Sequence, residues 1–132
     1  MKALIVDDEA HVIKAVRLLV PWESLGITQL FEASSPQEAI RLMEEWQPEI
    51  LITDIVMQDL SGIDLMSYIN HSALRSKVVV ISGYDNFEYV RGSLQNGGVD
   101  YLLKPLDQEQ LIAAVKKAVD AWNQETALLS TV

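Results

Sequence analysis

Four apolar segments of this chain each end directly in residues with chemically useful side chains, and helix-like segments lie between them. The segments and the residues that follow them are Ala3–Val6 with Asp7 and Asp8, Ile50–Thr53 with Asp54, Val78–Ile81 with Ser82, and Tyr101–Leu103 with Lys104. Strand and helix patterns alternate five times, which predicts an α/β fold with a mostly parallel sheet covered on both faces. Because parallel strands deliver their carboxyl ends to one edge, we expect these side chains to share one crevice there.

The helices are predicted from apolar spacing and from capping residues. The first helix places apolar residues inward from Val12 to Val20, and a weaker strand follows at 30–33. Ser35 to Glu38 form a capping box, with proline at the first helical position, for a helix that runs to about Trp46. The remaining helices are expected from Gly62 through Ile69, from Asp85 to the pair Gly97 and Gly98, and from 108 to about 129 after the cap Asp107.

Length and composition narrow the class of protein. At 132 residues the chain has room for one domain with a buried core. The sequence contains no apolar run of membrane-spanning length and no leader pattern, and it has no cysteine, so we expect a cytoplasmic protein. A net charge of −9 opposes attraction to nucleic acid or to anionic lipid, so these residues by themselves are not expected to bind DNA.

Three carboxylates are expected to crowd together at the strand ends. With the third strand beside the first, Asp54 would lie roughly 5 Å from the pair Asp7 and Asp8, where two charges repel by about 3 kcal/mol. Either one carboxyl group is protonated or a cation lies among them, and an oxygen-only site suits Mg²⁺, with Mn²⁺ as the alternative. The expected ligands are Asp8, Asp54 and the carbonyl of Val56, with Asp7 reaching the metal through water.

The same pocket would suit phosphoryl transfer. A carboxylate can form an acyl phosphate when a metal, a fixed cation and a hydroxyl hold the phosphoryl oxygens, and Lys104 and Ser82 supply the last two groups near Asp54. Each residue alone has a simpler interpretation. Asp7 or Asp8 could cap a helix, and Ser82 or Lys104 could be an ordinary loop or strand-end residue. The recurrence at four strand ends favours a functional site.

Taken in order, these residues resemble the response regulator receiver domain, the phosphoacceptor half of bacterial two-component signalling. The resemblance covers Met1 to about Ala121, and it rests on the acidic residues 7–9, the stretch 52–57, Ser82 with Gly83, and Lys104 with Pro105. It implies a flavodoxin-like (βα)5 fold, with a five-stranded parallel sheet doubly wound in the order 2-1-3-4-5.

The family resemblance also implies residue roles. Asp54 would be phosphorylated by a sensor histidine kinase, Asp7 and Asp8 would bind the metal, and Lys104 would pair with the phosphate. Ser82 and Tyr101 would form the switch that alters the face made by the fourth helix, fifth strand and fifth helix. The peptide bond between Lys104 and Pro105 is expected to be cis. Such a chain is a signalling phosphoacceptor and not an enzyme with turnover.

Two stretches carry a finer resemblance, namely 21–27 and 82–89, which look like receivers of regulators with an AraC-type helix-turn-helix domain. We therefore expect residues 1–121 to form the receiver. Residues 122–132 would extend the last helix or begin a linker to a DNA-binding output domain outside this chain, with a homodimer possible on activation.

Some positions depart from the family pattern or have more than one interpretation. Gln58 stands where proline is usual, which removes a rigid φ after the acceptor, and Gly98 stands where alanine is usual, which would loosen the exit of the fourth helix. Tyr84 could gate water or could simply pack. His11 and His71 have no partner at ligand spacing and are interpreted as solvated.

Two other functions are alternatives to this interpretation. A phosphatase of the haloacid dehalogenase type would need an aspartate two residues after Asp54, where this chain has Val56. A receiver-like module that acts without phosphorylation is the remaining alternative.

Overall fold

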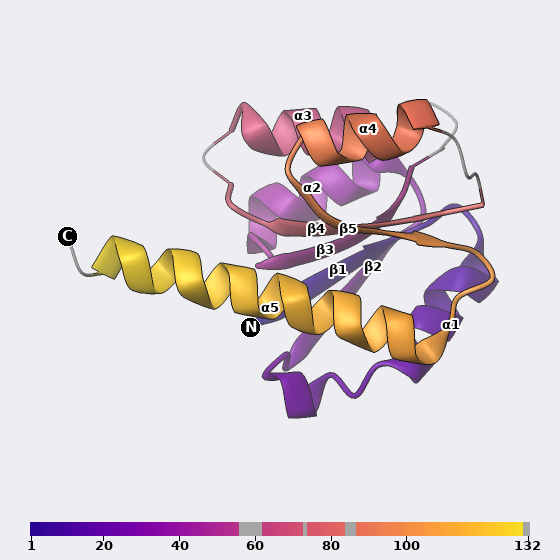
Figure 1. Ribbon diagram of the computed structural model, residues 1–132, viewed down its shortest axis with the longest axis horizontal. Coiled ribbons are helices and arrows are strands. Elements are labelled where there is room, and N and C mark those ends of the chain that lie inside the picture. The colour runs from indigo at the N-terminus through magenta and orange to yellow at the C-terminus, as the bar shows by residue number, and fades with distance from the viewer. Residues whose placement is uncertain (56–61, 73, 84–86, 131–132) are drawn as a thin grey trace.

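The computed structural model describes residues 1–55, 62–72, 74–83 and 87–130, without the side chains of residues 62, 63, 87 and 130. Within the described residues, five strands and five α-helices alternate (Figure 1). The strands are β1 (Lys2–Val6), β2 (Gln29–Ala33), β3 (Ile50–Asp54), β4 (Lys77–Ser82) and β5 (Gly98–Leu103). The helices are α1 (Ala10–Leu19), α2 (Pro36–Trp46), α3 (Gly62–Asn70), α4 (Phe87–Gln95) and α5 (Gln108–Ser130).

All four strand pairings are parallel, and the sheet order is β2-β1-β3-β4-β5. This order confirms the predicted doubly wound, flavodoxin-like fold. Helices α1 and α5 cover one face of the sheet, and α2, α3 and α4 cover the other (Figure 1). Strand β1 shows why both faces must be covered. Ala3 and Ile5 belong to the α1/α5 cluster, whereas Leu4 and Val6 belong to the other, and all four are fully buried.

Local signals in the sequence set several helix ends. The Ser35 hydroxyl accepts the Glu38 N–H at 3.2 Å, as an N-cap does, and Pro36 occupies the first turn of α2. Asp107 caps α5 in the same way, because its Oδ2 accepts the Gln110 N–H at 2.9 Å. The predicted cap of α4, Asp85, lies outside the described residues.

Strand β5 is longer than predicted, since it begins at Gly98 and not at Tyr101. The register between β4 and β5 shifts after Val78, so one extra residue bulges in β5, and the Asp100 side chain accepts the Tyr101 N–H at 2.9 Å. A glycine pair and an aspartate resemble a turn in sequence, which concealed the start of the strand.

Gly98 does not loosen the exit of α4 as predicted. Gly97 has φ +83° and ends the α4 segment, but Gly98 begins β5 in tight packing. A Cβ at position 98 would lie 2.9 Å from the Ser93 carbonyl oxygen and 3.0 Å from Met66 Cε. The absent side chain therefore allows α3 and α4 to pack closely against β5.

Helix α5 extends beyond the edge of the sheet (Figure 1). An ion pair between Lys77 and Glu125 ties its distal half to the start of β4. Among the described residues, no helix has both the length and the apolar character needed to cross a membrane.

Candidate functional site

The strand register places the predicted site residues at one edge of the sheet. Val6 pairs with Thr53, so Asp7 follows β1 at the level of Asp54, the last residue of β3. Ser82 and Leu103 are paired at the ends of β4 and β5, and Lys104 follows directly. The Lys104 N–H donates to the Ser82 carbonyl at 2.7 Å, which continues the ladder past the end of β5.

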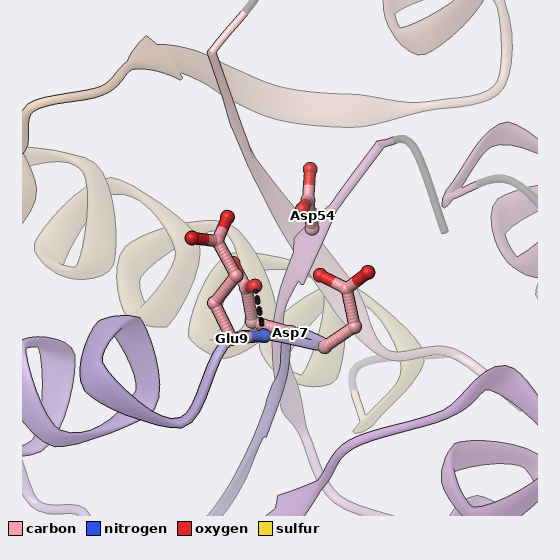
Figure 2. A group of neighbouring side chains, drawn as sticks. Asp7, Glu9 and Asp54 are labelled. Carbon is pink, nitrogen blue, oxygen red and sulfur yellow. Dashed lines mark hydrogen bonds between the residues drawn. The ribbon is translucent and has the colours of Figure 1, made fainter. Parts of the chain in front are cut away.

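The carboxylates converge into a single cluster. Asp7, Asp8, Glu9 and Asp54 each offer one carboxylate oxygen, and these oxygens lie within 4.8 Å of one another. Figure 2 shows Asp7 and Glu9, from the segment after β1, close to Asp54 at the end of β3. Asp7 and Asp54 are buried, whereas Asp8 and Glu9 are exposed. The cluster therefore has a buried floor and a hydrated rim.

The ammonium of Lys104 enters this cluster from β5. Its Nζ lies 2.9 Å from Asp7 Oδ2 and 3.2 Å from Asp54 Oδ2, and the side chain is 17% exposed. Burial alone would lower the pKa of Lys104, but the close contact and charge of Asp7, with the charge of Asp54, outweigh it and raise the pKa. The lysine therefore stays protonated and serves as a fixed cation.

Asp7 is the most constrained carboxylate of the cluster. Its Oδ1 accepts the Glu9 N–H at 2.9 Å, but the fully buried Oδ2 accepts no hydrogen bond from the described residues. It is only ion-paired with Lys104. Burial raises the pKa of Asp7, and the Glu9 N–H and Lys104 oppose that rise without cancelling it. One lysine leaves this group of four acids with excess negative charge.

These observations suit a hard divalent cation such as Mg²⁺. A buried carboxylate oxygen without a hydrogen bond, surrounded by other carboxylate oxygens, is the type of donor set that Mg²⁺ and Mn²⁺ bind. Asp7, Asp8 and Asp54 could all contribute oxygen atoms. Val56, the fourth predicted ligand, lies outside the described residues, as does Tyr84, the predicted gate.

The two predicted switch residues lie on adjacent strands. Ser82 is fully buried at the end of β4. Tyr101, in β5, is half-buried and packs against the apolar cluster beneath α2, α3 and α4. The Lys104–Pro105 peptide bond is cis.

Glu9 received no role from the sequence, although it is the third consecutive acid after β1. Its Oε1 lies 3.5 Å from Lys104 Nζ, and its Oε2 lies 3.5 Å from His11 Nε2. The run of three acids was the available signal. Only the fold shows that the third side chain turns back towards Lys104.

Comparison with known proteins places this arrangement in a family. The model of the response regulator receiver domain matches residues 3–116. The chain belongs to this family. As a receiver domain it is part of a two-component response regulator, a class of signalling proteins distinct from classical enzymes.

Individual relatives agree with this assignment. The transcriptional regulatory protein HptR of Staphylococcus aureus is 38% identical over 110 residues, which cover 83% of this chain and 43% of HptR. The receiver domain of AraT, a response regulator from Geobacillus stearothermophilus, is 32% identical with a TM-score of 0.86, covering 95% of this chain and 97% of that one.

A two component transcriptional regulator AraC from Clostridium phytofermentans is 28% identical with a TM-score of 0.84, covering 97% and 98% of the two chains. This receiver spans less than half the length of the curated relative it matches, 43% in the case of HptR.

Proposed function

We propose that this receiver domain accepts a phosphoryl group on Asp54 from a phosphohistidine of a partner sensor kinase. The observation that carries the proposal is the position of Asp54 between a fixed cation and an acid cluster. Lys104 Nζ lies 3.2 Å from Asp54 Oδ2, and Asp7, Asp8 and Glu9 complete the cluster. This combination of nucleophile, cation and metal-binding oxygens is what phosphoryl transfer requires.

The transfer follows from the groups present. An Asp54 carboxylate oxygen attacks phosphorus, an O–P bond forms, and the N–P bond of the donor breaks, with its electron pair returning to the imidazole. Asp7, Asp8 and Asp54 would hold Mg²⁺, and a metal ion there would supply positive charge for the phosphoryl oxygens. Lys104 exchanges its contact with Asp54 for the transferred phosphoryl oxygens.

The signalling output depends on the structural change that phosphorylation causes around the site. The new phosphoryl group adds negative charge and acceptor oxygens beside Lys104 and Ser82. We infer that the Ser82 hydroxyl donates to it, and that Tyr101 moves in response, because the two residues lie on adjacent strands, with Tyr101 two pairs before Ser82 in the register. The face formed by α4, β5 and α5 would then change between two arrangements.

We also propose the organisation of the longer protein. Residues 1–121 form the receiver, and residues 122–132 belong to a C-terminal helix extension or to the start of a linker towards a DNA-binding output domain. The uninterrupted α5 helix from Gln108 to Ser130 supports this proposal. So does the name of HptR, a transcriptional regulatory protein more than twice as long as the matched region. Homodimerisation on activation belongs to the same proposal.

The test is direct phosphorylation with phosphoramidate and Mg²⁺, followed by intact mass. We expect the wild-type chain and the matched variant Asp120→Asn, on the exposed side of α5, to gain one phosphoryl group. Asp54→Asn should gain none. A folded wild-type chain that gains no mass, and whose association state is unchanged by beryllofluoride, would instead support an interaction module that works without phosphorylation.

A further inference from the structure

The fourth carboxylate of the cluster, Glu9, reaches the site from its solvent side. The side chain is 51% exposed, and its Oε1 lies 3.5 Å from Lys104 Nζ. Its other oxygen, Oε2, lies 3.5 Å from His11 Nε2 in the first turn of α1. The carboxylate is therefore held between two nitrogen groups at the rim of the cluster.

Lys104 faces three carboxylates at graded distances. Its Nζ is 2.9 Å from Asp7, 3.2 Å from Asp54 and 3.5 Å from Glu9. The ammonium donates hydrogen bonds to Asp54 and Glu9 and is ion-paired with Asp7, so three carboxylates hold it. A phosphoryl group that is to pair with Lys104 must displace at least one of them.

Glu9 differs from Asp7 and Asp54 in its position and in its distance from the Lys104 ammonium. Asp7 and Asp54 belong to the buried set that suits a divalent cation, and a bound cation would offset their charge. Glu9 lies at the rim, and its contact with the lysine is the longest of the three. It is therefore the acceptor that remains available to Lys104 once the buried oxygens are engaged elsewhere.

We propose that Glu9 is a positioning residue that holds the Lys104 ammonium before phosphorylation and competes with the incoming phosphoryl group for it. The proposal rests on the proposed phosphoacceptor function and deepens it by naming a residue that sets how readily the site accepts an anion. Glu9 acts through Lys104 and does not itself receive the phosphoryl group.

The informative variant is Glu9→Gln, which preserves size and one acceptor oxygen but removes the charge. Two affinities should move in opposite directions. The Mg²⁺ affinity should fall by about two- to fivefold, because an acid near the metal is lost, and the affinity for beryllofluoride at saturating Mg²⁺ should rise by about two- to fivefold. Isothermal titration calorimetry measures both. A residue that only supported the fold would lower both affinities together.

If Glu9 competes with the anion for Lys104, the effect of Glu9→Gln must require a cation at position 104. Direct repulsion between Glu9 and the anion would not require it. In a Lys104→Met background, Glu9→Gln should no longer raise the beryllofluoride affinity. In a Lys104→Arg background, which keeps a cation, the gain should persist. A gain of equal size with methionine at position 104 means that Glu9 repels the anion directly, and the positioning role is then refuted.

A control variant and the behaviour of the wild type distinguish failure of this proposal from failure of the phosphoacceptor function. Glu45→Gln removes the same charge from the exposed side of α2, near the opposite edge of the sheet, and should leave both affinities unchanged. If the wild-type chain binds no beryllofluoride, the proposed phosphoacceptor function itself is wrong. If the wild type binds it and Glu9→Gln binds it equally or more weakly, only the role of Glu9 is refuted.

Discussion

Lys104 Nζ lies 3.2 Å from Asp54 Oδ2, although the two residues are 50 positions apart in the chain. Strand β4 separates their strands, so the backbone alone does not bring them together. The lysine spans the gap because its stem is long and its backbone is anchored to Ser82 at the end of β4. The contact joins the carboxylate that we propose as the phosphoryl acceptor to the strand whose face we propose as the output.

Removing this lysine should destabilise the metal-free protein. Lys104→Met leaves the buried carboxylates Asp7 and Asp54 without their cation. In buffer with a chelator, we expect the free energy of unfolding to fall by about 1–3 kcal/mol. Urea denaturation measures this change, and saturating Mg²⁺ should reduce the deficit. An unchanged free energy in chelator would show that the ammonium contributes nothing to the fold.

Metal binding should appear as a stability gain that requires Asp8. At a Mg²⁺ concentration ten times the dissociation constant, the wild type should gain about 1.4 kcal/mol in free energy of unfolding. Asp8 is exposed, so Asp8→Asn should leave the metal-free stability nearly unchanged while removing most of the gain. Asp120→Asn, also exposed, is the matched control and should keep the gain. Equal gains in both variants would argue against Asp8 as a ligand.

Alanine at position 98 should destabilise this chain. The added Cβ would lie 2.9 Å from a backbone oxygen of α4 and 3.0 Å from Met66 Cε. Overpacking of this kind costs about 1–3 kcal/mol. Gly83→Ala is the control, because its Cβ would meet no atom of the described residues within 4 Å. Similar unfolding midpoints in urea for the two variants would show that α3 and α4 adjust freely.

The pH dependence of stability should include one tyrosine on α3. The Tyr68 hydroxyl donates to Glu44 on α2, and this hydrogen bond, with a smaller effect of burial, raises the pKa of Tyr68 above 10.0. A raised pKa means that the folded state favours the neutral phenol. The resulting stabilisation is complete below about pH 10 and is lost as the pH rises through the folded-state pKa.

Glu44→Gln tests this assignment, because it should lower the pKa of Tyr68 towards its ordinary value. Ultraviolet absorbance at tyrosinate wavelengths follows the titration, and Tyr68→Phe identifies the contribution of this ring among the four tyrosines. Glu45→Gln, on the next residue of α2, should leave the titration as in the wild type. A Tyr68 titration that does not respond to Glu44→Gln would mean that the hydrogen bond does not form in solution.

Local sequence signals predicted most of the elements because the forces behind them act within a few residues. Ser35 and Asp107 cap their helices through bonds to backbone groups three residues away. The continuous apolar stretch Val78–Ile81 is buried on both faces of the sheet. Strand β5 was underestimated because its first residues carry turn signals, which pairing with β4 overrides.

The chain by itself therefore determined the α/β alternation and the strand ends that carry Asp7, Asp54, Ser82 and Lys104, because apolar periodicity is a local property. Tertiary structure alone decided that Glu9 turns towards Lys104, that Asp7 Oδ2 is buried without a hydrogen bond among the described residues, and that Gly98 must lack a side chain. Each of these depends on atoms from distant segments meeting within a few ångströms, and such distances are set only when the sheet and its helices pack.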